Sequence, residues 1–566
     1  MSGVDVVAIV EQVERLLAEA GSLPEAARVA VEKLLNVVEA LSSDKKELAE
    51  EVDRLRKRLE QKKNNNKTTG NQDESQGGSQ DSQDDKREND HSSQKRRRQR
   101  EKKRRRTRDR RSFKDLTIHE TKECPVDPAI LPPDAVRLDD EIVIVQDIEI
   151  KPKNTKFQRQ VFYSASQQHT YRGPLPPGCD QGDFSANLRA LIIALKYCGN
   201  MSEPKIGELL ENFDVQVSSG SLSNILTNSA AAFEQEYDDI LQAGLASTTY
   251  QQTDDTSARV AGQFWHTHIL CNPFYTFYST RPRKDRLSVL GVLQNTDDLQ
   301  FRFGDETLDL LHREFLTVPA KWQSRLADLG DRVYGEADLK SRLDEWFGEK
   351  NQQLRTAIEQ AAAIVFYRHQ SRVPVVRTLV CDDAGQFKLL TDDLALCWIH
   401  EGRHYEKLSP VVKRHASALE SFRESYWDLY QSLQEYRAGP SAELASRLRV
   451  EFDKLFSTRT GYEALDARIA KTLSKREELL TVLAHPEVPL HNNASELGAR
   501  VSARRRDVSL HSRSERGVRA MDIFTTLVQT SKKLGVSAYT YLCDRLQGTS
   551  ALPTLSQTIT LAAASG

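Results

Sequence analysis

The chain has 566 residues, of which 38% are hydrophobic, and its formal net charge is −2. This length exceeds what a single hydrophobic core accommodates, so we expect several domains. There is no apolar run long enough to cross a bilayer and no signal-peptide pattern at the start, which argues against membrane and secreted proteins. The seven scattered cysteines include no Cys-x-x-Cys pair and predict free thiols in a cytoplasmic protein.

Residues 1–62 are predicted to form a helix that pairs in a coiled coil. Leucines recur every seven residues, and mostly β-branched residues stand three positions before them, as in parallel two-stranded coils. The leucines are Leu34, Leu41, Leu48 and Leu55, and the second series is Val31, Val38, Lys45, Val52 and Leu59. The alternative is an amphipathic helix that packs on its own chain.

Residues 63–111 are predicted to be a disordered linker that ends in a basic run. Residues 63–94 are almost entirely polar and cannot offset the entropy cost of ordering. Residues 95–111 carry a net charge of +11, which predicts contact with DNA phosphates, although a solvated tail is the alternative. The candidate DNA-binding residues of this run are Lys95, Arg96, Arg97, Arg98, Lys102, Lys103, Arg104, Arg105 and Arg106.

Two smaller regions follow the basic run. Residues 112–180 are rich in Val, Ile and Pro and predict a small β-containing module, with alternation over residues 141–150 and a second β-like stretch over residues 157–166. Residues 181–245 predict a buried helix and then two short helices joined by a tight turn, the helix-turn-helix pattern of DNA-binding proteins. Ser221 and Asn224 could reach base edges from the second helix; an ordinary helical hairpin is the alternative.

The remainder of the chain alternates between strand and helix patterns. Three strands are predicted within residues 246–304, and one more strand, followed by the segment 395–408, within residues 373–408. Helical patterns fill residues 305–372 and 409–485, helices close the fold over residues 486–548, and residues 549–566 are predicted to be a flexible tail. This order is that of an RNase H-like α/β core with helical insertions, within a multidomain α+β protein.

Acidic residues stand at the ends of two predicted strands and at the start of a later helix. The strand residues are Asp254 and Asp255 in the first case and Asp382 and Asp383 in the second, and Glu496 is the helical residue. Three carboxylates from separate elements can hold two divalent metal ions, an arrangement suited to phosphoryl transfer on DNA. We therefore expect one residue of each group to be a metal ligand.

Each of these positions also has a structural explanation. Adjacent aspartates are common in turns, and Glu496 stands three residues after Asn493, as in a capping box. Cys397, His400 and His404 have spacings that could bind zinc, but we favour packing and DNA contact for this group.

Several segments resemble a known family in their order and character. They are DDTSARV, LVCDDAGQF, LCWIHEGRHYEKL and PLHNNASELGARVSARRR, followed by residues 514–546. The chain resembles the insertion sequence 66 family of bacterial transposases. The resemblance implies a DDE enzyme that cuts element ends and joins them to target DNA, using two Mg²⁺ ions for which Mn²⁺ can substitute. It implies Asp254, Asp382 and Glu496 as the catalytic and metal-binding residues, with Asp255 and Asp383 as alternates.

The resemblance also implies partners and a place of action. The implied partners are double-stranded DNA, at terminal inverted repeats and at target sites, and small companion proteins. The chain would form a homodimer or higher oligomer through the coiled coil. The implied place of action is the nucleoid, in the cytoplasm. Further candidate DNA contacts are Arg281, Arg283, His400, Arg403, Asn492, Asn493, Arg500, Arg504 and Arg505. The cysteine motif of the family's N-terminal half is absent here, so no zinc is predicted. Leu497 stands where the family usually has arginine, and an inactive or domesticated DNA-binding descendant, a repressor or scaffold, is the alternative function.

Overall fold

The structure is a computed structural model that describes residues 12–13, 15, 24–67, 117–132, 135–136, 139–179, 182–315, 318–348 and 350–565. It divides into two compact units, one of residues 51–151 and the other of residues 1–50 together with 152–566. Most of the predicted linker and the whole basic run lie outside the described residues. The fold is mixed α+β, as predicted. Among the helices that are described, none has the length and apolar character needed to cross a bilayer.

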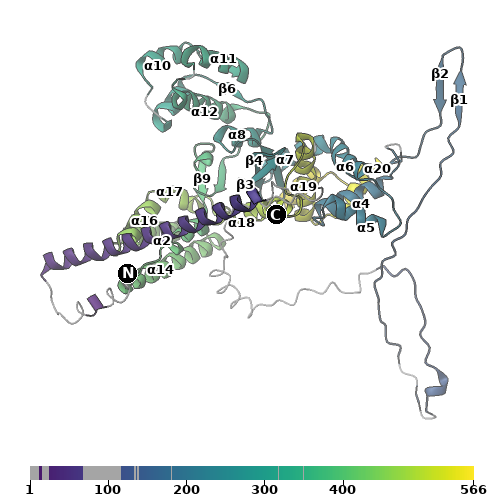
Figure 1. Ribbon diagram of the computed structural model, residues 1–566, viewed down its shortest axis with the longest axis horizontal. Coiled ribbons are helices and arrows are strands. Elements are labelled where there is room, and N and C mark those ends of the chain that lie inside the picture. Colours follow the sequence, from purple (N-terminus) through teal and green to yellow (C-terminus); the bar gives the residue numbers. More distant parts are fainter. Residues whose placement is uncertain are drawn as a thin grey trace. The chain divides into compact units, whose positions relative to one another are not determined.

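A mixed five-stranded sheet lies at the centre of the larger unit (Figure 1). Its strands are β3 (Tyr250–Val260), β4 (Gln263–Cys271), β5 (Thr276–Arg281), β8 (Thr378–Cys381) and β9 (Asp393–Leu396). Their order is β5-β4-β3-β8-β9, with β3 to β5 antiparallel and with β8 and β9 parallel to β3. Ala261 and Gly262, at φ 48° and 82°, form the tight turn between β3 and β4, because two left-handed residues match the twist of a hairpin.

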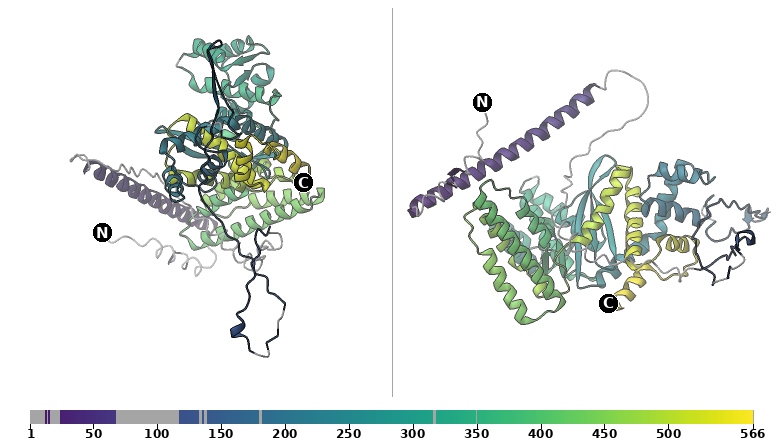
Figure 2. Two further views of the ribbon diagram at one scale, coloured as in Figure 1. Left: turned by 90° about the vertical axis from the view of Figure 1, so that its right-hand side faces the viewer. Right: turned by 90° about the horizontal axis from the view of Figure 1, so that it is seen from below.

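Helix α18 (Asn493–Ser509) packs closely against β3 and β4, and helix α19 (Glu515–Leu534) follows it (Figure 2). Gly498 permits this approach, because a Cβ atom there would lie 2.8 Å from a methyl carbon of Ile269. The hydroxyl of Tyr278 donates to the Gly498 carbonyl oxygen at 3.1 Å. The short distance between helix and sheet fixes where the side chains of the first turns of α18 lie.

Helix α19 closes the outer edge of the sheet with side chains. Asp522, Thr526 and Thr530 recur every four residues, so they share one face of the helix. They accept hydrogen bonds from the backbone N–H groups of the edge strand β5, at Thr280, Tyr278 and Thr276, over 2.7, 3.0 and 3.2 Å. An edge strand whose N–H groups are satisfied in this way is closed to further strand pairing.

Helices precede the sheet over residues 186–246. They are α4 (Ala186–Tyr197), α5 (Glu203–Glu211), α6 (Ser219–Asn228), the 3₁₀ helix η3 (Ser229–Phe233) and α7 (Glu234–Ala246). Ser185, Ser202 and Ser218 cap α4, α5 and α6 through side-chain bonds to backbone N–H groups. The helix pair α5–α6 is therefore confirmed as an element, whereas its role as a DNA-reading helix-turn-helix stays a prediction.

The segment predicted as the helical insert 305–372 also contains a strand. Just before the insert lie α8 (Arg286–Gln294) and β6 (Gln300–Arg302). The insert itself contains α9 (Asp305–Leu310), the π-helix η4 (Leu311–Phe315), α10 (Ala320–Ala327), β7 (Val333–Gly335), α11 (Glu336–Phe347) and α12 (Gln352–His369). Strands β6 and β7 form a second, two-stranded antiparallel sheet. Three-residue strands are too short to produce a visible alternation pattern, which is why the sequence did not predict them.

Long helices form the insertion between β9 and α18, as predicted. They follow the 3₁₀ turn η5 (Gly385–Phe387) and the short helix α13 (Trp398–Glu406). The insertion consists of α14 (Lys413–Ala438), α15 (Ala442–Phe456), α16 (Glu463–Leu473), α17 (Arg476–Leu479) and η6 (Thr481–Leu483). In the right-hand view of Figure 2, α14, α15 and α16 lie side by side in green.

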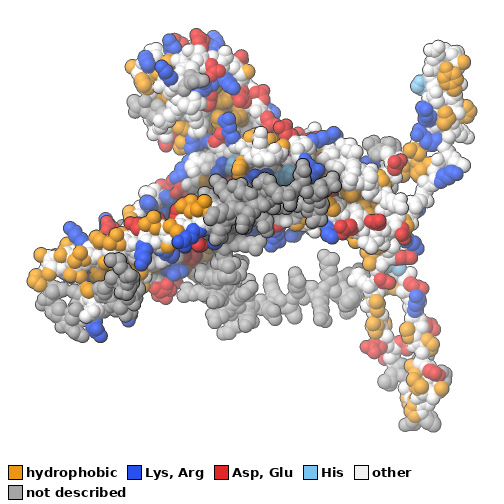
Figure 3. All heavy atoms as spheres, viewed as in Figure 1, with side chains coloured by type: hydrophobic (Ala, Val, Ile, Leu, Met, Phe, Trp, Pro, Cys, Tyr) orange, Lys and Arg blue, Asp and Glu red, His pale blue; other side chains and the backbone are white. Residues whose placement is uncertain are grey.

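Helix α2 (Glu25–Lys67) contains the predicted heptads and continues five residues beyond the predicted end at residue 62. Leu35 is buried against Val412, and Val31 and Val38 pack on the same cluster. The leucine series Leu34, Leu41, Leu48 and Leu55 is instead exposed, and orange side chains follow this helix in Figure 3. Part of the heptad pattern is thus used within the chain, while the leucines remain available for the predicted coiled-coil pairing, which stays a prediction.

Two predicted segments differ in the structure. Residues 141–150 do not form a strand, and Ile142 and Val145 are 85% and 82% exposed. The second predicted stretch, residues 157–166, contains β1 (Val161–Ser164), which pairs with β2 (His169–Arg172); the 3₁₀ helix η2 (Pro128–Ile130) precedes them in sequence. The predicted flexible tail 549–566 is also wrong. After α20 (Ala538–Gln547), helix α21 (Leu555–Ser565) packs on α7, with Leu555 and Ile559 fully buried one helical turn apart.

Candidate active site

The alternation of β3 places Asp254 and Asp255 on opposite faces of the sheet. Asp254 shares a face with Thr256, whose hydroxyl accepts a hydrogen bond from Arg506 of α18 at 2.9 Å. Asp255 points to the other face, where its carboxylate accepts from Gln386 at 2.9 Å and pairs with Lys284 at 3.4 Å. Asp254 is therefore the aspartate on the side covered by α18.

Asp382 and Asp383 directly follow β8 and have different surroundings. Asp383 forms ion pairs with Lys388 at 2.9 Å and with Lys475 of the insertion at 2.6 Å. Burial alone would raise its pKa, but the hydrogen bonds from these two lysines bring the pKa below its ordinary value. Asp382 accepts the Ala384 backbone N–H at 3.1 Å, and its pKa is raised because burial outweighs that bond. Asp383 is thus neutralised by lysines, whereas Asp382 is not.

Glu496 lies in the first turn of α18, but it does not form the predicted capping box. The N-cap residue is Asn492 rather than Asn493, and its side chain makes no capping bond. Asn492 instead donates its side-chain amide to the Thr253 carbonyl oxygen at 2.7 Å, which ties the start of α18 to β3 beside Asp254. The carboxylate of Glu496 is therefore left for another role.

The residues nearest to Glu496 come from α13. His400 Nδ1 lies 3.6 Å from one carboxylate oxygen of Glu496, and Arg403 lies 3.5 Å from the other. Glu496 Oε1 is buried and has no hydrogen-bond partner among the described residues. These two neighbours hold the carboxylate on the side of β3 that α18 covers, where Asp254 lies within the strand and not at its end as predicted.

Asp254 lies near enough to Asp382 and Glu496 for their charges to act on it. The pKa of Asp254 rises to about 7, chiefly because of burial, and the nearby charges of Asp382, Asp255 and Glu496 raise it further. Half-buried carboxylates that repel one another in this way favour a cation among them. Their oxygen atoms are the hard ligands that Mg²⁺ prefers, so the residues present fit a divalent metal site.

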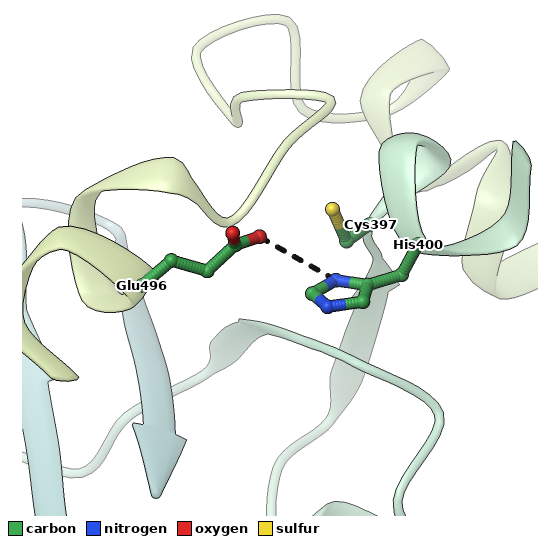
Figure 4. Close-up of side chains that lie close together, drawn as sticks. All are labelled: Cys397, His400 and Glu496. Carbon is green, nitrogen blue, oxygen red and sulfur yellow. Dashed lines mark ion pairs between the residues drawn. The ribbon is translucent and has the colours of Figure 1, made fainter. Parts of the chain in front are cut away.

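Sequence reasoning missed one grouping at this site. Cys397, His400 and Glu496 place their ligand atoms within 4.8 Å of one another, and Figure 4 shows them converging from α13 and α18. His404, which the sequence grouped with Cys397 and His400, is exposed and outside this cluster. The Cys-x-x-His spacing is visible in the sequence, but only the fold brings Glu496 to it.

Most of the predicted DNA-contacting residues that the structure describes are exposed or half-buried. Arg283, Arg500, Arg504 and Asn224 are exposed, and Ser221, His400, Arg403 and Asn493 are half-buried. Arg281 is mostly buried and pairs with Asp297 at 2.6 Å.

Two predicted contacts are not supported. Asn492 is 1% exposed and serves the joint between α18 and β3 described above. Arg505 is 6% exposed, lies over the Tyr197 ring at 4.9 Å and donates to Thr525. Neither side chain reaches the surface, so direct DNA contact by Asn492 and Arg505 is wrong for this structure.

Comparison with known proteins gives two matches. The model of the family described as "Transposase IS66 family" matches residues 345–520, a range that includes Asp382, the helical insertion and Glu496. The chain is also similar to the uncharacterized protein y4jO of Sinorhizobium fredii (strain NBRC 101917 / NGR234). The two are 34% identical over 310 residues, which cover 54% of this chain and 94% of the relative.

Proposed function

Because the chain belongs to the IS66 family of transposases, we propose that it is a DDE transposase that cuts the ends of an insertion sequence and joins them to target DNA. The observation that carries the proposal is that the charges of Asp382, at the end of β8, and Glu496, on α18, both act on Asp254 of β3. Three antiparallel strands followed by two parallel ones, in the order β5-β4-β3-β8-β9, support an RNase H-like core.

We assign the three carboxylates as the ligands of two Mg²⁺ ions, with Mn²⁺ as a substitute. The bound ions would neutralise charge on the reacting phosphate and activate the attacking oxygen. The protein itself contributes position. Asn492 anchors the start of α18 to β3, and His400 and Arg403 orient Glu496. Rigid placement of reacting groups is a large part of catalysis when the protein forms no covalent intermediate.

DNA is the proposed partner on several surfaces. Arg500 and Arg504 are exposed on α18, the helix that carries Glu496, and can pair with phosphates close to the reacting bond. The helix pair α5–α6 and the basic run 95–111 would contact the element ends on nucleoid DNA. The exposed leucines of α2 would pair two copies of the chain, so that both ends are held together.

The test is strand cleavage and joining in Mg²⁺ on duplexes that carry the terminal inverted repeat of the element. Asp254→Ala, Asp382→Ala and Glu496→Ala should each lower the rate by roughly 10³-fold, because each removes a ligand worth several kcal/mol at the transition state. Asp383→Asn is the matched control next to Asp382. It should keep most of the activity, because two lysines already neutralise Asp383.

The outcomes separate the two candidate functions. Full activity in all three alanine variants would contradict the assignment of the carboxylates. Specific binding of the end sequence by the unmodified chain, with no cleavage in either Mg²⁺ or Mn²⁺, would support the alternative, a repressor or scaffold descended from a transposase.

A further inference from the structure

Cys397, His400 and Glu496 form a ligand set of a different chemical kind beside the carboxylates. Cys397 immediately precedes α13 and His400 is three residues later, so both lie on the first turn of that helix. Glu496 approaches them from α18, and the three ligand atoms lie within 4.8 Å of one another (Figure 4). A thiol, an imidazole and a carboxylate thus face one point.

Two of these three side chains carry a buried polar atom without a partner. His400 Nδ1 and Glu496 Oε1 are both buried, and neither makes a hydrogen bond to any described residue. They lie 3.6 Å apart, which is longer than a hydrogen bond between nitrogen and oxygen. Buried polar atoms in folded proteins nearly always have a partner, so a pair left open here indicates a missing ligand.

The thiol of Cys397 is held in place by N–H donors. It is 1% exposed, and the backbone N–H of Asn492 donates to its sulfur at 3.3 Å. The backbone N–H groups of His400 and Ile399 also direct hydrogen bonds to this sulfur. Burial raises the pKa of this thiol to about 11 although these N–H donors lower it, so a metal ion has to displace the thiol proton when it binds.

Sulfur, nitrogen and oxygen donors together suit Zn²⁺ and similar borderline-soft ions, whereas Mg²⁺ prefers oxygen donors alone. We propose that Cys397, His400 and Glu496 bind a Zn²⁺ ion, with a fourth position open to water. Zn–ligand bonds of about 2.0–2.3 Å bring ligand atoms to roughly 3.5 Å apart, so modest side-chain rotations complete the site. Binding transfers the thiol proton to solvent. The sequence predicted no zinc because it lacks an N-terminal cysteine motif; this site lies elsewhere in the chain.

The proposed Zn²⁺ site and the proposed Mg²⁺ site share Glu496. The effect of Zn²⁺ on DNA joining that follows from this rests on the proposed function. A carboxylate that binds Zn²⁺ together with Cys397 and His400 is not available to the Mg²⁺ ions. Zn²⁺ therefore acts as an inhibitor of DNA joining by withdrawing one of the three carboxylates.

The binding test uses Co²⁺, a spectroscopic substitute for Zn²⁺, titrated into the full chain. One equivalent should produce a thiolate-to-cobalt absorption band, which Zn²⁺ abolishes and Mg²⁺ leaves unchanged. Cys397→Ala and His400→Ala should remove the band. The matched controls are Cys271→Ala, at another buried cysteine, and His404→Ala, one turn further along α13. Both controls should keep the band.

Thermal unfolding without metal shows which variants are folded. His400 is half-exposed, so its replacement should disturb the fold less than that of Cys397. If Cys397→Ala unfolds, the cobalt band of His400→Ala tests the site instead. No band in the unmodified chain, or an equal band in folded His400→Ala, would overturn the site.

The inhibition test compares joining in Mg²⁺ with and without micromolar Zn²⁺, each variant relative to its own rate in Mg²⁺. The unmodified chain should lose activity severalfold, and Cys397→Ala should lose much less. A cobalt band without joining under any condition would support the zinc site and count against the transposase assignment. Joining that Zn²⁺ does not slow in the unmodified chain would overturn the competition for Glu496.

Discussion

Asp522 is a fully buried carboxyl group outside the candidate active site, and its protonation affects stability. Thr280 donates two hydrogen bonds to it, from the backbone N–H at 2.7 Å and from the hydroxyl at 2.8 Å. Burial nevertheless raises its pKa from 3.8 to about 6. The folded protein therefore binds this proton more tightly than the unfolded chain does. It follows that the stabilisation is present at low pH and is lost as the pH rises from about 4 through 6.

We expect Asp522→Asn to remove this pH dependence. Asparagine can accept the backbone bond and donate to the Thr280 hydroxyl, so the β5 edge stays covered without a titrating group. Between pH 4 and pH 7 the unmodified protein should lose roughly 3 kcal/mol of unfolding free energy that the variant keeps. Urea unfolding at both pH values measures the difference. Asp428→Asn, at an exposed position on α14, should behave like the unmodified protein. Equal pH slopes in Asp522→Asn and the unmodified protein would refute the assignment.

At the scale of residues, the sequence could identify the acidic positions but not every partner. Alternation along β3 is a local property, and it is enough to separate Asp254 from Asp255 once a face is buried. Asp382 and Asp383 both follow the end of a strand, where alternation no longer applies. Lys475, which neutralises Asp383, comes from the far end of the helical insertion. No local pattern in the sequence predicts that contact.

At the scale of elements, a glutamate of α2 caps a helix distant in sequence. The Glu39 carboxylate accepts the backbone N–H groups of Val411 at 2.9 Å and Val412 at 2.8 Å, just before α14 begins. Asn36 adds bonds to the Gly461 carbonyl oxygen and from the Glu463 N–H, at 2.9 and 2.8 Å. The first heptads of α2 are thus fixed to the insertion by polar contacts in addition to Leu35.

Replacing Glu39 should loosen this attachment. Glu39→Ala leaves buried N–H groups without an acceptor, and we expect a loss of about 2 kcal/mol in unfolding free energy. Faster cleavage within α2 during limited proteolysis should accompany the loss. Glu47→Ala, an exposed glutamate on the same helix, is the control and should change neither property. Unchanged proteolysis of α2 in Glu39→Ala would show that the cap does not hold the helix.

The elements that sequence reasoning missed have physical reasons in common. Strand β9 and strands β6 and β7 have four or three residues, too few for a period to emerge. Residues 141–150 alternate well, but a strand needs a neighbour, and no strand of the described residues pairs with them. In helix α21, Leu555 and Ile559 lie on one face. The remaining residues of this helix are only weakly polar, so the contrast between an apolar and a polar face was too small to predict the helix.

At the scale of the whole molecule, the exposed leucines of α2 predict association between chains. Leu48 and Leu55 are 66% and 47% exposed, on a helix whose other face is already in use near Leu35. Leu48→Lys combined with Leu55→Lys should convert the dimer to a monomer, because charges at these positions oppose a coiled-coil seam. Analytical ultracentrifugation measures the change. Val450→Lys, at an exposed position on α15, should leave the dimer intact. A monomeric unmodified chain would contradict the pairing.

The order of elements and the mixed α+β class were predictable, but the assembly of the site was not. Strand β8 pairs with β3 although the insert lies between them in sequence, and the 409–485 insertion separates β9 from α18. Periodicity describes one element at a time, so the meeting of three remote carboxylates came from the family resemblance and not from local pattern.

The order in which β3, β8 and α18 follow one another in the sequence has a consequence for biosynthesis. A ribosome that has completed the sheet and the insertion has produced two of the three carboxylates, while the helix that carries Glu496 is still to be translated. On the proposed function, the nascent polypeptide gains its third carboxylate only when α18 has been made and can fold onto β3 and β4.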